Sequence, residues 1–101
     1  MSDPAGIPAL IGAIRHMHGV SAEHVGTEHV KEIASTGETV WDGDAEIFAL
    51  AAHPKAKRAY AWSEATTGTK RRFFAVLHTE PVTDAAAAVR VSILADARTL
   101  R

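Results

Sequence analysis

The fold of this chain is decided by the stretch Lys57-Arg58-Ala59-Tyr60-Ala61-Trp62-Ser63-Glu64. From Arg58 on, large side chains occupy every second position of this stretch, and Ala59, Ala61 and Ser63 stand between them. Successive side chains of a β-strand point to opposite faces of the sheet. The stretch therefore predicts a strand with alanines on one face and aromatic rings on the other.

Further strands are predicted on both sides of this stretch. Residues 70–78 follow a polar hairpin loop at 65–69 and alternate in the same way. Residues 38–51 follow a Ser-Thr-Gly turn and predict a long strand, with Gly43 as a bulge or kink. Alternatively, Asp42-Gly43 forms a tight hairpin turn that splits this strand in two. Residues 24–33 carry β-branched side chains without a helical stripe, and this favours a strand over a helix.

Two helices are predicted, one at each end of the chain. The first carries an apolar stripe from Ile7 to Met17, with Ser2 or Asp3 as its cap and Gly19 as its end. The second is capped by Thr83 or Asp84 and runs to about Arg98, with an apolar side that includes Val82, Ala85 and Val89.

These elements predict a single α+β domain over residues 1–101, in the order α-β-β-β-β-α. Short links between the strands favour an antiparallel four-stranded meander with both helices packed on one face. The other face then keeps exposed aromatic rings, which would line a groove or a dimer interface. The ligand-binding or interface residues predicted on this basis are Trp62, Tyr60, Arg58, Phe48 and Trp41.

The composition excludes several classes of site. The chain has no cysteine, so disulfides, zinc–thiolate sites and thiol nucleophiles are absent. The N-terminal residues lack the basic start of a signal peptide, and no apolar run is long enough to span a bilayer. We therefore expect a cytoplasmic protein. No motif for a phosphate, a dinucleotide or another cofactor is present, and no cofactor is expected.

Charge is distributed unevenly along the chain although the net charge is only −1. Acidic residues dominate the first half and basic residues the second half. Pairing of charges across neighbouring strands explains this pattern most simply. A basic face for an anionic ligand is the alternative.

Six histidines raise the question of metal binding and of acid–base chemistry. His16 and His18 are two positions apart, which places them on different sides of a helix, and no metal site is expected. General acid–base candidates are Glu28, His29, Glu32 and His53. For His53, which precedes Pro54, a structural role is favoured, in which the ring holds the turn through a hydrogen bond.

A single-stranded nucleic-acid binder is a further alternative. Bases can stack on aromatic residues of a sheet that is flanked by cations. The near-neutral net charge argues against this class, because dedicated nucleic-acid binders are strongly basic. The residues that suggest it are Lys55, Lys57, Arg58, Lys70, Arg71 and Arg72, with Tyr60, Trp62, Phe73 and Phe74.

A pattern over roughly residues 16–98 resembles that of a group of small uncharacterised bacterial proteins. It consists of Gly37-Glu38-Thr39-Val40-Trp41-Asp42-Gly43, Phe48, His53-Pro54-Lys55-Ala56 and Tyr60-Ala61-Trp62. The resemblance implies a free-standing bacterial cytoplasmic domain, and it carries no functional residue over to this chain.

Taken alone, the sequence favours an interaction or small-ligand-binding domain that acts as a homodimer through one sheet face. The alternatives are a small enzyme with His and Glu acid–base residues in a sheet-face cleft, and the nucleic-acid binder described above.

Overall fold

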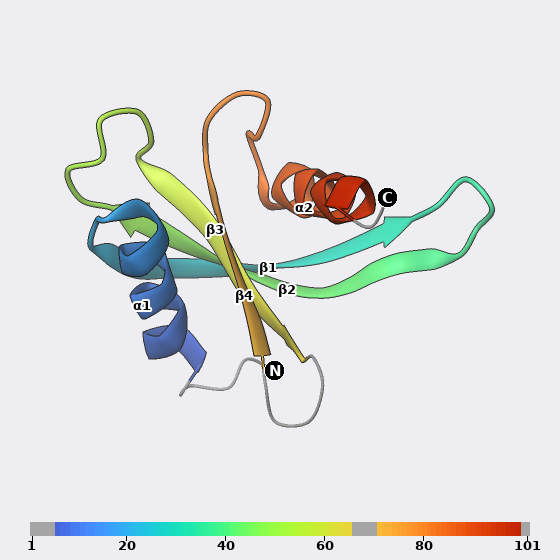
Figure 1. Cartoon of the computed structure of the whole chain (residues 1–101), viewed down its shortest axis with the longest axis horizontal. Coiled ribbons are helices and arrows are strands. Elements are labelled where there is room, and N and C mark those ends of the chain that lie inside the picture. The colour runs from blue at the N-terminus through green and yellow to red at the C-terminus, as the bar shows by residue number, and fades with distance from the viewer. Residues whose placement is uncertain (1–5, 66–70, 100–101) are drawn as a thin grey trace.

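The computed structural model describes residues 6–65 and 71–99. Its elements are α1 (Gly6–His18), β1 (Ala22–Ile33), β2 (Thr39–Leu50), β3 (Arg58–Ala65), β4 (Arg71–Leu77) and α2 (Ala85–Thr99) (Figure 1). The strands form one antiparallel sheet in the order β1-β2-β3-β4. The predicted α+β class, element order and meander are confirmed. No helix in these ranges is both long enough and apolar enough to cross a membrane.

The helix ends follow the predicted local chemistry where the structure describes them. Gly19 follows the last residue of α1, its φ of 70° is in the left-handed region, and its N–H donates to the Arg15 carbonyl at 2.8 Å. Asp84 caps α2, because its Oδ1 accepts a hydrogen bond from the Ala87 N–H at 2.7 Å. The predicted caps Ser2 and Asp3 lie outside the described residues.

The β1–β2 hairpin corrects the prediction about Gly43. This residue pairs with Val30 in an unbroken ladder, so it forms neither a bulge nor a hairpin turn. The register shifts instead beside Val25 and Val40, and both side chains are about half exposed. Gly43 lies close to the Trp41 ring. A Cβ atom there would lie 3.2 Å from the Trp41 ring.

The two helices cover opposite faces of the sheet, which corrects the prediction that they share one face. α1 packs on Phe48 of β2 and on the alanines of β3, Ala59 and Ala61. α2 packs on the aromatic residues of β3, Tyr60 and Trp62. The alanine face therefore admits a helix as predicted. The aromatic face is covered too, because the small residues on the inner side of α2 allow that helix to approach large rings.

The sheet divides where β2 and β3 part. These strands pair only from Glu46↔Ala61 to Ala49↔Arg58. Beyond that point, residues 39–45 of β2 pair only with β1, and residues 62–65 of β3 pair only with β4. Figure 1 shows the two hairpins running in clearly different directions. We call the opening between residues 39–45 and 62–65 the fork.

Candidate ligand-binding cavity at the fork

A cavity of about 720 Å³ lies at the fork, on the face of the sheet that α1 covers. Ile7 and Leu10 of α1 form one side of it, and Phe73 of β4 forms part of another. The polar side chains that line it come from the strands. They are His29, Asp42, Asp44, Glu46, Ser63 and Arg71. An apolar wall with a few convergent polar groups is the usual character of a small-molecule site.

The edges of the two parted strands also line the cavity. Residues 42–44 of β2 and residues 62–63 of β3 are consecutive lining residues. Because successive side chains point to opposite faces, a cavity lined by consecutive residues touches the strand edge itself. Main-chain N–H and C=O groups on this side of β2 and β3 have no partner in the β2–β3 ladder. The fork therefore offers main-chain donors and acceptors beside its charged side chains.

Glu46 is the buried charged side chain of this cavity, with only 4% of its surface exposed. Its Oε1 accepts hydrogen bonds from Thr27 Oγ1 at 2.5 Å and from His24 Nε2 at 2.8 Å. Burial of a carboxylate costs free energy unless donors compensate it. Two donors from β1 meet that requirement and fix the orientation of the carboxylate at the cavity wall.

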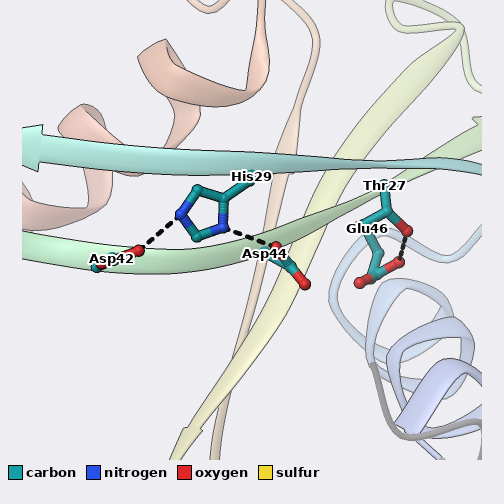
Figure 2. A network of polar contacts seen from close by, with 5 residues as sticks. All are labelled: Thr27, His29, Asp42, Asp44 and Glu46. Carbon is teal, nitrogen blue, oxygen red and sulfur yellow. Dashed lines mark hydrogen bonds and ion pairs between the residues drawn. The ribbon is translucent and has the colours of Figure 1, made fainter. Parts of the chain in front are cut away.

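His29 lies between two carboxylates of β2, as Figure 2 shows. Its Nε2 is 2.7 Å from Asp42 Oδ1, and its Nδ1 is 3.0 Å from Asp44 Oδ1. The hydrogen bond with Asp44 raises the pKa of His29 above its ordinary value of 6.5, and the negative charge of Asp42 acts in the same direction. Both ring nitrogens are thus engaged, which suits an imidazolium that bridges two acids.

Arg71 brings positive charge to the opposite wall. Its Nε donates to Ser63 Oγ at 2.9 Å, and its Nη2 donates to the Ser63 carbonyl at 3.1 Å. These contacts hold the guanidinium along β3 and leave its other N–H groups without a partner among the described residues. The cavity therefore has carboxylates on the β2 wall and a cation on the wall formed by β3 and β4.

Three of the five predicted site residues are core residues of a single chain. The exposed fractions of Trp62, Tyr60 and Phe48 are 3%, 4% and 0%. Phe48 also faces α1, whereas Tyr60 and Trp62 face α2, so these rings do not form one surface. Trp62 stacks on Phe74 with the ring centroids 5.3 Å apart. Of the five, Trp62 alone is among the residues that line the fork cavity.

The other two predicted site residues lie apart from each other. Trp41 packs edge-on against Trp62, with the ring centroids 5.7 Å apart, on the face that α2 covers. Arg58 is exposed and lines a smaller hollow of about 380 Å³ together with Lys55, Lys57 and His78. The structure therefore does not bring the predicted residues together in one site.

The acid–base candidates are also separated. Glu32 forms an ion pair with Arg90 of α2, whereas His29 faces the opposite side of β1. His53 accepts main-chain hydrogen bonds from Lys55 at 3.0 Å and Ala56 at 2.9 Å. The predicted structural role of His53 is thereby confirmed. Within residues 6–65 and 71–99, no three His, Asp or Glu side chains are placed to hold a metal ion.

The aromatic face that suggested nucleic-acid stacking is covered by α2. Tyr60 and Trp62 are buried there, and Phe73 lies on the opposite face from Phe74. Lys70 lies outside the described residues. In the described residues, the rings on which that alternative depends therefore do not form one open face.

The acidic wall of the cavity was not predicted from the sequence. Asp42, Asp44 and Glu46 stand at every second position of one strand, which puts all three on the same face. That spacing is visible in the sequence. What it does not show is that β3 parts from β2 at this level and leaves the three carboxylates beside a cavity.

Comparisons of the chain with protein-family models, with curated proteins and with solved structures gave no match.

Proposed function

We propose that this domain binds a small polar molecule in the fork cavity. The single observation that carries the proposal is the buried Glu46 carboxylate, fixed by Thr27 and His24 at the wall of a cavity of about 720 Å³. A buried, pre-oriented carboxylate provides strong and directional recognition of a ligand N–H group. The unpaired strand edges of the fork supply further hydrogen bonds to the same ligand.

Binding is a better account of this cavity than acid–base catalysis. His29 is the histidine that lines the cavity, and both of its ring nitrogens are engaged by Asp42 and Asp44. A general base needs a free nitrogen within reach of the proton that it removes. The contacts of His29 instead support a role in holding the two carboxylates in place.

The sequence-based expectations of a cytoplasmic location and of a homodimer remain part of this proposal. Tyr60, Trp62 and Phe48 are buried within one chain, so the dimer is not needed to cover them. The proposed binding needs only the residues of a single chain.

The proposal is tested with a library of small polar metabolites in a thermal-shift assay. A ligand that binds only the folded protein raises its melting temperature, by an amount that grows with ligand concentration. We expect at least one compound to stabilise the wild-type protein. Ala9→Trp should abolish this effect, because Ala9 is an exposed residue of α1 that lines the cavity and the indole would occupy it.

His16→Trp is the matched control for this experiment. His16 is also exposed on α1, but it does not line the cavity. The control should keep the ligand-dependent stabilisation of the wild type. Equal responses of both variants to the compound would place its binding site elsewhere, and a library without any stabilising compound would count against the proposed function.

A further inference from the structure

The charges of the fork cavity are divided between its two walls. Asp42, Asp44 and Glu46 belong to β2, whereas Arg71 belongs to β4. His29 and His24, which contact these carboxylates, carry at most two positive charges against three negative ones, so the β2 wall keeps a net negative charge. The β4 wall has the Arg71 guanidinium, which Ser63 orients.

The distance between these walls selects among charged ligands. Ser63 holds the Arg71 guanidinium along β3, the strand next to β2. Paired neighbouring strands are about 4.8 Å apart, and at the fork β2 and β3 are unpaired and part further. A ligand that contacts both walls must therefore carry its positive and negative groups on atoms several bonds apart. The apolar side chains of Ile7, Leu10 and Phe73 suit an aliphatic segment between them.

We infer that the ligand of the fork cavity is amphoteric, with an amine that binds the carboxylates of β2 and a carboxylate that binds Arg71. This inference rests on the proposed function and names its ligand class as an ω-amino carboxylate. Each end makes charge-assisted hydrogen bonds, which are stronger than those between neutral groups. The carboxylate end pairs with a planar guanidinium, which is suited to bidentate contact with an acid.

Three matched probes test the inference by isothermal titration calorimetry. They are ε-aminocaproate, which has both charged ends, hexylamine, which has only the amine, and caproate, which has only the acid. A hydrogen bond to a charged group contributes about 1.5–3 kcal/mol, so ε-aminocaproate should bind at least about tenfold more tightly than either single-ended probe.

Two variants assign the ends of the probe to the walls. Arg71→Gln should reduce the affinity for ε-aminocaproate to that for hexylamine and leave hexylamine binding unchanged. Asp44→Asn should weaken the binding of ε-aminocaproate and hexylamine and leave caproate unchanged. Melting curves of both variants without ligand verify that they are folded.

The outcomes separate this inference from the proposed function. Hexylamine or caproate binding as tightly as ε-aminocaproate would overturn the amphoteric ligand, and absence of binding by all three probes would overturn it as well. In either case, the cavity would still be supported as a binding site if a compound from the metabolite library stabilises the wild type and Ala9→Trp abolishes that stabilisation.

Discussion

Trp41 Nε1 donates a hydrogen bond to Glu64 Oε1 at 2.7 Å, and this contact joins β2 to β3 across the fork. The two residues belong to the strand segments that have no ladder pairing with each other. Their bond closes the fork on the face that α2 covers, while the cavity opens on the other face. The side chains thus replace the missing main-chain pairing on one side and leave the other side hollow.

Loss of this contact should lower the free energy of unfolding. Trp41→Phe removes the donor but keeps an aromatic ring, and a hydrogen bond to a charged acceptor contributes about 1.5–3 kcal/mol. Glu64→Gln should cost less, because the amide oxygen still accepts the bond. Urea denaturation of both variants measures the difference. Equal stability of wild type and Trp41→Phe would show that the hydrogen bond between Trp41 and Glu64 does not stabilise the fold.

The close approach of Gly43 to the Trp41 ring predicts a coupled pair. Gly43→Ala should destabilise the domain, because its new Cβ would lie 3.2 Å from the ring atom Cη2 of Trp41. Phenylalanine lacks this outer part of the indole, so Gly43→Ala should cost much less in a Trp41→Phe background. A double-mutant cycle in urea measures the coupling, and additive effects would contradict the contact.

Trp62 should behave as a core residue despite its contact with the cavity. Trp62→Ala should cost about 3–5 kcal/mol, which is enough to unfold a domain of marginal stability. Trp62→Phe should cost much less. Its ring can still stack on Phe74, and it removes the Nε1 donor, which is buried without a hydrogen-bond partner among the residues that the structure describes. Thermal melts compare the variants, and a stable, well-folded Trp62→Ala would place this ring outside the core.

His29 should make stability depend on pH. Its pKa is raised in the folded protein, so the stabilisation from its aspartate contacts is fully present below the unfolded-state value of 6.5. It is lost as the pH rises through the folded-state pKa. The stability difference between wild type and His29→Gln should therefore shrink with rising pH. An NMR titration should find a lower His29 pKa in Asp44→Asn than in wild type. An unchanged pKa would contradict the contact between His29 and Asp44.

Much of the architecture followed from local patterns in the sequence. The alternation in residues 57–64 predicted a two-faced strand, and Gly19 and Asp84 marked helix ends through local hydrogen bonding. The face that each helix covers was not predicted correctly. Alternation shows that both faces of β3 are apolar, but it does not show which helix covers each face. The alanines of α2 fit the aromatic face, and this became evident only from their packing.

The location of the candidate site could be predicted even less from local patterns, because it depends on tertiary structure. Asp42, Asp44 and Glu46 share a face by simple spacing, but their function depends on where β2 and β3 stop pairing. No local pattern marks that point, because the residues on both sides of it are ordinary strand residues. Arg71 likewise became a site residue only through its contact with Ser63 on the neighbouring strand.

Amide NMR with a stabilising small molecule shows whether the fork cavity is the binding site of this domain, as we claim. On titration of the ligand, we expect the largest chemical-shift changes at the strand residues that line the cavity, which are 42–44, 46, 62–63, 71 and 73, and no comparable changes in Ala9→Trp. Shift changes centred on Lys55, Lys57 and Arg58, which line the other hollow, would contradict the claim.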